Sequence, residues 1–274
     1  MSDLVPRLLS AVVMICLALG ALWLGGRWFV AFWLVAAAAV FWEWLGIIGS
    51  QRRLVTALFG AGVLALAAAL ASNAGAEFAL LAVLVGAVGV GVLERKGLPG
   101  WAFSGLLYAG VLIVSVTSLR MSVYPVHALN SILWLFAVVW GTDILAYFGG
   151  RLIGGPKLWP AISPSKTWSG FLTGVIGGAL AGTFVLFSQT PPSQRSIFTF
   201  MVLGLLAAAV SQAGDFFESA VKRRFGVKDA SNLIPGHGGF MDRLDGFIAA
   251  SAFAAFLGLL RGGPANPATG LLVW

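Results

Sequence analysis

Acidic and basic side chains gather in one short stretch of an otherwise apolar chain. Ten charged residues lie between Asp215 and Asp245, out of 17 basic and 10 acidic residues in the whole sequence. Asp215 ends an apolar run, where an ionised carboxylate is costly unless it is paired or binds a cation. Asp242 and Asp245 are three residues apart at the start of the next run, so a helix would place them on one face. Carboxylates from two helices beside several basic side chains would suit Mg²⁺ and the phosphates of a substrate.

A glycine-rich turn, Pro235-Gly236-His237-Gly238-Gly239, lies between these two groups of acids. Its glycines permit positive φ and close approach of the backbone to a ligand. A turn of this kind that leads into a helix also presents backbone N–H groups to anions. The acidic helix start that follows makes this weak pattern much more specific for phosphate chemistry.

A second polar segment runs from Thr142 to Gly170. Its hydroxyl groups and cation just before an expected helix are Ser163, Ser165, Lys166 and Thr167. That combination predicts a second phosphate-binding site. Asp143 lies about two turns inside the membrane from Arg151, and an intramembrane carboxylate is a functional candidate by default.

The elements that must position these residues are apolar helices. The chain is 59% hydrophobic and 10% charged, whereas soluble domains carry about 25% charged residues. A membrane span needs roughly 20 apolar residues, and the backbone must satisfy its own hydrogen bonds there as a helix. Nine such runs lie near residues 8–26, 28–49, 54–71, 78–93, 101–118, 129–150, 168–188, 196–217 and 243–261.

We therefore predict an all-α, polytopic integral membrane protein with about nine transmembrane helices. The first run has features of a secretory signal, but its length and the run that follows at once favour a transmembrane helix. We divide the chain into amino-terminal transmembrane helices, residues 1–128, and a carboxyl-terminal catalytic region, residues 129–274. The only sizeable segments between runs are about 151–167 and about 218–242.

The basic residues indicate the orientation and the class of partner. Thirteen of the 17 Lys and Arg residues fall on the side of the amino terminus, a bias that predicts a cytoplasmic amino terminus. Eight of the thirteen lie in the two long polar segments, where charges can serve chemistry, so the orientation depends mainly on where the substrate lies. A net charge of +7 on a membrane protein fits anionic head groups or a polyanionic substrate and does not indicate nucleic acid. We expect a multi-pass membrane protein; an active site on the cytoplasmic side of a bacterial inner (cell) membrane is implied only by the family resemblance that follows.

The polar segments resemble the phosphatidate cytidylyltransferase (CDP-diacylglycerol synthase) family. The family signature S-x-x-K-R, K-D, P-x-H-G-G and D-R-x-D matches at Ser219, Lys222, Arg223, Lys228, Asp229, Pro235, His237, Gly238, Gly239, Asp242, Arg243 and Asp245. The elements upstream of it match at Asp143, Ala146, Tyr147, Ser163, Pro164, Lys166, Thr167, Gln212, Gly214, Asp215 and Glu218. The resemblance is close in the carboxyl-terminal half and rests on hydropathy alone in the first four helices.

The resemblance implies transfer of the cytidylyl group from CTP to phosphatidic acid within a lipid membrane, with release of pyrophosphate. The implied cofactor is Mg²⁺, held by Asp215, Asp242 and Asp245, and a second cation is left open. The residues that it places at the catalytic centre are Asp215, Asp242, Lys222, Arg223, Lys228, Asp229, His237, Arg243 and Asp245. The basic side chains would bind phosphate. His237 could act as a base, but a role in hydrogen bonding or in shaping the loop is favoured because phosphatidate is already an anion. The residues that it places at the substrate are Ser163, Lys166, Thr167, Asp143, Arg151, Ser219, Gly238 and Gly239.

Two other functions and several details stay open at this stage. A CTP-dependent lipid kinase would need similar charges but would release CDP, and a transporter would carry its charges nearer the middle of the membrane. The acceptor could be an ether-linked analogue of phosphatidate. The oligomeric state is open, a homodimer included. Glu43, between Trp42 and Trp44, lies about two turns inside the second run, where it could line a polar cavity or extend its carboxyl group to the membrane interface.

Overall fold

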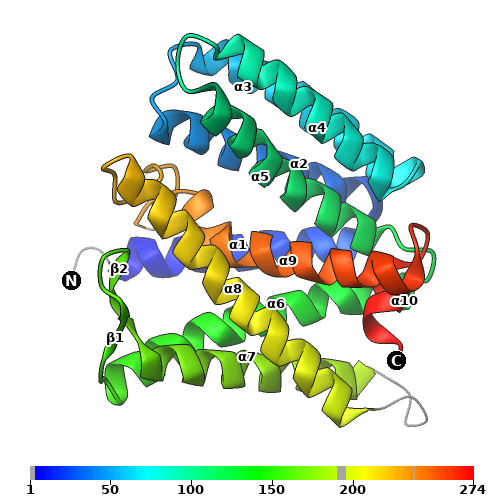
Figure 1. Ribbon diagram of the computed structural model, residues 1–274. Helices are drawn as coiled ribbons and strands as arrows, with labels where there is room; N and C mark the ends of the chain where they lie inside the picture. Colours follow the sequence, from blue (N-terminus) through cyan, green and yellow to red (C-terminus); the bar gives the residue numbers. More distant parts are fainter. Residues whose placement is uncertain (1–3, 190–195, 237) are drawn as a thin grey trace. The chain divides into compact units, whose positions relative to one another are not determined.

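The protein folds almost entirely into helices. The computed structural model describes residues 4–189, 196–236 and 238–274. Over these residues the long helices coincide with the nine predicted runs (Figure 1). They are α1 (Leu4–Leu24), α2 (Gly26–Ile47), α3 (Arg53–Asn73), α4 (Ala76–Leu93), α5 (Pro99–Arg120), α6 (Pro125–Leu152), α7 (Trp168–Gln189), α8 (Ile197–Arg224) and α9 (Met241–Gly262). A short helix, α10 (Pro267–Leu272), follows near the carboxyl terminus.

Eight of the described helices, α2 to α9, are long and apolar enough to cross a membrane. The corresponding apolar stretch described in α1 is shorter, Leu9–Leu24. Large apolar side chains such as Trp23, Phe184 and Phe198 stay mostly exposed on these helices, as expected where lipid is the solvent. The prediction of an all-α, multi-pass membrane protein is confirmed.

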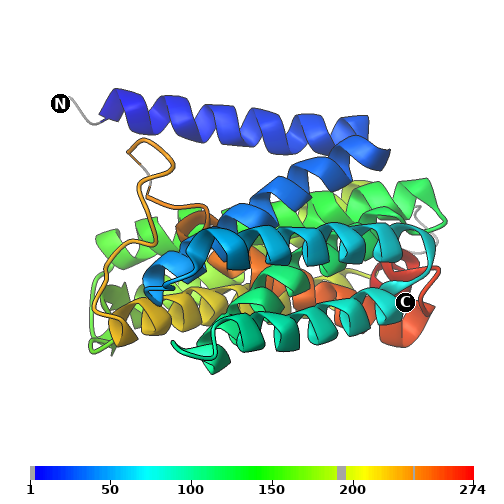
Figure 2. The same cartoon turned by 90° about the horizontal axis from the view of Figure 1, so that it is seen from above.

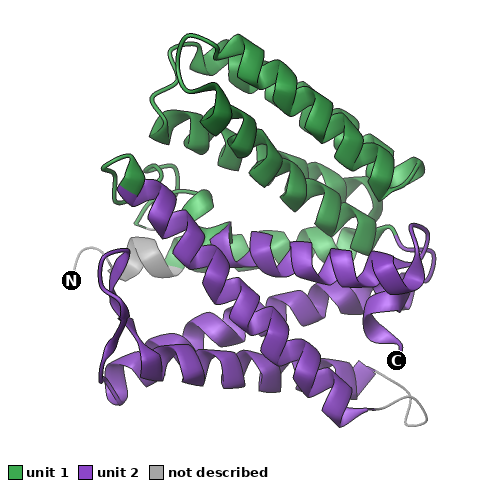
Figure 3. Cartoon of the chain, in the orientation of Figure 1, with its two compact units in different colours: residues 1–121, 224–244 green, residues 122–223, 245–274 purple. Residues whose placement is uncertain are grey.

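The chain forms two compact units, shown in different colours in Figure 3. Unit 1 comprises residues 1–121 and 224–244, and unit 2 comprises residues 122–223 and 245–274. Helix α9 therefore begins in unit 1 and continues in unit 2. The predicted division into residues 1–128 and 129–274 stays a prediction. The compact units are divided differently, because unit 1 contains the loop before α9 as well as the amino-terminal helices.

Unit 1 has a core of aromatic side chains from α2. Phe29, Trp33, Phe41 and Trp44 are buried there, and the Trp44 indole Nε1 donates a 2.8 Å hydrogen bond to the Trp101 carbonyl oxygen. A single residue, Gly25, separates α1 from α2; its φ of 61° allows the bend seen in Figure 2. The bend requires glycine because other residues rarely adopt this φ. Glu43, the single acidic residue of α2, is therefore on a helix with several well-buried aromatic side chains in unit 1.

Unit 2 is organised by close packing of α6 against α7. Glycines recur at every fourth position of α7, at Gly170, Gly174, Gly178 and Gly182. A Cβ atom at Gly174 would lie 2.9 Å from the Thr142 carbonyl oxygen on α6. Small residues at this spacing let two membrane helices approach closely. The packing fixes the part of α6 that carries Asp143.

Two details of the polar segments differ from the sequence-based expectation. Residues between α6 and α7 form an antiparallel hairpin of β1 (Lys157–Trp159) and β2 (Ser163–Thr167), where a loop near 151–167 was expected. Helix α8 runs to Arg224, so the expected loop from about 218 starts two turns later. Good helix formers and an ion pair of 2.7 Å between Glu218 and Lys222, four residues apart, account for the longer helix.

Candidate active site

Asp215 on α8 forms an ion pair with the Lys166 ammonium group on β2. Both side chains are half-buried. The Lys166 Nζ also lies 4.4 Å from the centre of the Phe216 ring, and the Ser219 hydroxyl is 3.5 Å from the Asp215 Oδ1 atom. The hairpin and α8, both in unit 2, are therefore joined by the two residues that the sequence assigned to phosphate and to metal.

Asp245 on α9 adds a second carboxylate to this place. It lies within electrostatic range of Asp215, Lys166 and Asp143 of α6, and its Oδ1 atom accepts a 2.8 Å hydrogen bond from the Gly246 N–H. We call Asp143, Lys166, Asp215 and Asp245 the carboxylate cluster. The cluster thus gathers three acids around a single ammonium group, and an added cation would offset the repulsion between the carboxylates.

The donor chemistry of the carboxylate cluster fits Mg²⁺. Mg²⁺ binds oxygen, and in nucleotide enzymes it commonly takes one or two carboxylates while substrate phosphates and water complete its coordination. Among the described residues, no three His, Cys, Asp or Glu side chains form a ready-made metal cage. A cation bound at the carboxylate cluster would therefore need further oxygen ligands from substrate or water.

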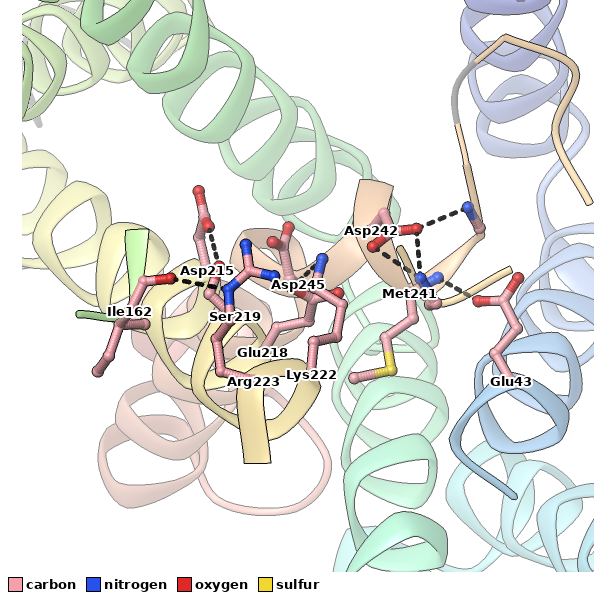
Figure 4. A network of polar contacts seen from close by, with 12 residues as sticks. Glu43, Ile162, Asp215, Glu218, Ser219, Lys222, Arg223, Met241, Asp242 and Asp245 are labelled. Atoms are coloured by element: carbon pink, nitrogen blue, oxygen red, sulfur yellow. Dashed lines mark hydrogen bonds and ion pairs between the residues drawn. The ribbon is translucent and has the colours of Figure 1, made fainter. Parts of the chain in front are cut away.

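Asp242 holds together the loop that precedes α9, within unit 1. Its Oδ2 atom accepts hydrogen bonds from the backbone N–H groups of Gly239 at 2.7 Å and Ala230 at 3.0 Å (Figure 4). Gly238 has a φ of +84°, and a Cβ atom there would lie 2.7 Å from that same oxygen. Glycine is therefore required at position 238 by its positive φ and by its close approach to the Asp242 carboxylate.

Glu43 is the residue of this region that sequence reasoning left unassigned. Its side chain is fully buried, and its Oε1 atom accepts hydrogen bonds from the Ser231 hydroxyl at 2.6 Å and the Phe240 N–H at 2.9 Å. Its Oε2 atom accepts one from the Met241 N–H at 2.7 Å. Figure 4 shows Glu43 beside the start of α9. The only sequence signal was a single acid in an apolar run.

The basic signature residues have different surroundings. Lys222 is mostly buried and pairs with Glu218 in the same helix. The exposed Arg223 places its Nε atom 3.4 Å from the Ile162 carbonyl oxygen, at the hairpin of unit 2. Arg151 is also exposed and donates to the Tyr147 hydroxyl at 2.6 Å.

The other predicted site residues that the structure describes lie at or near the protein surface. Lys228, Asp229 and Arg243 are exposed, and Ser163 is half-buried on β2. His237 lies outside the described residues. The side chains of Lys228, Asp229 and Arg243 thus reach the protein surface, whereas Lys222 is mostly buried beside Glu218.

Thr167 acts as the amino-terminal cap of α7. It is buried, and its hydroxyl oxygen accepts a 3.1 Å hydrogen bond from the Gly170 N–H.

Loss of a threonine cap costs about 1 kcal/mol. We expect Thr167→Ala to lower the unfolding free energy by about that amount, and Thr167→Ser to retain most of it. Unfolding of the purified protein in detergent measures this; unchanged stability of Thr167→Ala with a raised KM for CTP would instead indicate a direct substrate contact.

Comparison with known proteins places the chain in a family. The model of the Cytidylyltransferase family matches residues 5–260. A phosphatidate cytidylyltransferase of Brucella suis is 38% identical over 268 residues, which cover 97% of each chain. Proteins of the same name from Haemophilus influenzae and Bacillus subtilis are each 42% identical, over 161 and 132 residues, covering 57% and 48% of this chain and 55% and 48% of theirs. The chain belongs to the cytidylyltransferase family.

Proposed function

We propose that this membrane enzyme transfers the cytidylyl group from CTP to phosphatidic acid, giving CDP-diacylglycerol and pyrophosphate. One observation carries the proposal: the relative from Brucella suis, named phosphatidate cytidylyltransferase, matches over 97% of the chain. The match includes the polar segments that hold the carboxylate cluster and the loop before α9.

The reaction joins two anions, so the protein must first neutralise and orient them. A phosphate oxygen of phosphatidate attacks the α-phosphorus of CTP, and pyrophosphate leaves from the opposite side. Holding both reactants in line removes much of the entropic barrier. Exposed Lys228, Arg223 and Arg243 are suited to the triphosphate or to the lipid phosphate, because charge-assisted hydrogen bonds to phosphate are strong.

Mg²⁺ is the cofactor that we propose, held by Asp215 and Asp245 in the carboxylate cluster, with Asp242 one turn before Asp245 on α9 as the third predicted ligand. When bound, Mg²⁺ neutralises phosphate charge and polarises the phosphoryl oxygen. Lys166 now pairs with Asp215; an incoming phosphate would compete for its ammonium group. Lys166 is thereby placed to move from carboxylate to substrate.

The active site belongs, in this proposal, on the cytoplasmic side of a bacterial inner membrane, with the amino terminus on the same side. CTP is a cytoplasmic metabolite, and basic residues collect in the segments on that side. The lipid substrate would come from the surrounding bilayer. Topology reporters fused at the amino terminus and in the loop before α9 would test the assignment by appearing on the same side.

Product identification tests the reaction itself. Purified protein in mixed micelles with Mg²⁺, phosphatidate and CTP labelled at the α-phosphorus should place label in CDP-diacylglycerol and release one pyrophosphate per product. Release of CDP would favour the lipid kinase. Parallel reactions with ester-linked and ether-linked acceptors would decide which lipid is used.

Removal of divalent cations tests the cofactor. Chelation by EDTA is expected to stop turnover because the carboxylate cluster then lacks the cation that offsets its charge, and added Mg²⁺ should restore it. Full activity in EDTA would contradict the metal proposal without contradicting the cytidylyl transfer.

A further inference from the structure

We propose that Glu43 is a positioning residue for this reaction: its carboxylate fixes the start of α9 and the signature loop, by which we mean the described residues 225–236 and 238–240. This inference rests on the proposed function. It assigns a role in catalysis to the amino-terminal helices, in which the sequence showed no motif. All contacts that support it lie within unit 1.

The Glu43 carboxylate binds three donors from the signature loop and the helix start. Both oxygens are used: Oε1 accepts from Ser231 Oγ and Phe240 N, and Oε2 accepts from Met241 N, at 2.6 to 2.9 Å. Phe240 and Met241 are the residues at which α9 begins. Their N–H groups have no partner within the helix, so an external acceptor is needed there. Glu43 supplies that acceptor from a helix almost 200 positions earlier in the chain.

The charge of this buried carboxylate is balanced locally. The amino terminus of a helix carries partial positive charge, which favours an anion. Arg53 of α3 adds a full charge within electrostatic range of Glu43. The Arg53 guanidinium is held in place because it lies 3.9 Å from the centre of the Trp42 ring and donates to the Trp42 carbonyl oxygen at 2.9 Å. The start of α9 and Arg53 therefore both place positive charge near this buried carboxyl group.

The fit of the loop around Glu43 leaves no room for a side chain at Gly239. A Cβ atom there would lie 2.6 Å from Glu43 Oε1 and 2.7 Å from Oε2. The Gly239 N–H donates to Asp242 on the other side. The two carboxylates thus hold the loop from opposite sides, Asp242 across residues 230 to 239 and Glu43 at residues 231, 240 and 241.

The consequence for the reaction is geometric. Asp242, Arg243 and Asp245 all project from the first five residues of α9. A shift of that first turn would move these side chains together. Misplacement of about 1 Å can cost about 100-fold in rate even when the altered residue is remote from the chemistry. Glu43 has no need to touch substrate in order to influence turnover.

Glu43→Gln tests the proposal, because an amide has the same shape but turns one acceptor oxygen into a donor that faces an N–H group. The matched control is Glu94→Gln. Glu94 is also a buried glutamate of unit 1, and its Oε1 atom accepts from the hydroxyls of Ser50 and Thr56, outside the signature loop. We expect kcat for CDP-diacylglycerol formation to fall at least tenfold in Glu43→Gln and to stay within about twofold of wild type in Glu94→Gln, both measured per folded protein. Equal kcat values for the two variants would overturn the proposal.

A double-variant cycle separates positioning from general loss of stability. Gly239→Ala disturbs the same contact, so the loss in Glu43→Gln/Gly239→Ala should be close to the larger single loss. Losses that multiply would show that Glu43 acts elsewhere. If Glu43→Gln does not fold, Ser231→Ala offers a milder test because it removes only one of the three hydrogen bonds to Glu43. We expect Ser231→Ala to lower kcat while the melting temperature stays near that of the wild type. An unchanged kcat would count against the inference. Lack of CDP-diacylglycerol formation by the wild-type protein would refute the proposed function instead.

Discussion

Asp215→Ala is expected to reduce the turnover of CTP and phosphatidate by at least about a hundredfold, a typical cost for loss of an electrostatic group at a reacting centre. Asp215 is the ion-pair partner of Lys166 and interacts electrostatically with Asp245 in the carboxylate cluster. Its loss removes an oxygen ligand for the proposed Mg²⁺ and leaves the Lys166 ammonium group without its ion pair. The initial rate of pyrophosphate release in mixed micelles, at saturating Mg²⁺ and CTP, measures the effect.

Two further variants make this result interpretable. Asp215→Asn keeps the shape but not the charge, and should be nearly as inactive as Asp215→Ala. Glu77→Gln removes an exposed acid at the start of α4 and should leave the rate unchanged. An Asp215→Asn variant with a near-normal rate would show that this carboxylate does not bind the cation.

Asp242→Ala is the second variant with a large expected effect, and it should change both the rate and the loop. The Asp242 carboxylate accepts hydrogen bonds from the N–H groups of Ala230 and Gly239. Its removal therefore deprives both parts of the signature loop of a hydrogen-bond acceptor. We expect a loss of turnover of about a hundredfold or more, together with faster hydrogen exchange of the Ala230 and Gly239 amides. Mass spectrometry of peptides covering 225–240 would measure the exchange.

The two readouts separate the two roles of Asp242. Lost turnover with unchanged exchange would leave it as a metal ligand only, and the loop-holding role would be wrong. Faster exchange with a normal rate would exclude it as a ligand. An unchanged rate and unchanged exchange would contradict both.

Much of the fold could be predicted because membrane helices are specified by local composition. A run of about 20 apolar residues has few alternatives in lipid, and each of the nine runs became a helix. The extension of α8 was missed because its last two turns are polar, and polarity was taken as the mark of a loop. The hairpin at Lys157–Thr167 was missed because two short strands leave no periodic pattern long enough to detect.

The site was only partly predictable for a different reason. Sequence reasoning identified Asp143, Asp215 and Asp245, and the structure brings them together with Lys166. It could not assign Glu43, because the partners of that carboxylate are mainly backbone N–H groups far along the chain, and backbone groups carry no sequence signal. It also read Thr167 as a phosphate ligand, whereas a buried hydroxyl that caps a helix has the same sequence pattern.

Binding of Mn²⁺ in place of Mg²⁺ tests the central claim most directly, since electron paramagnetic resonance reports the cation without need of turnover. In the presence of CTP, the wild-type protein is predicted to bind Mn²⁺, and Asp215→Asn is predicted to lose most of that bound signal while remaining folded. Equal Mn²⁺ binding by the wild type and by Asp215→Asn would contradict the account of the carboxylate cluster.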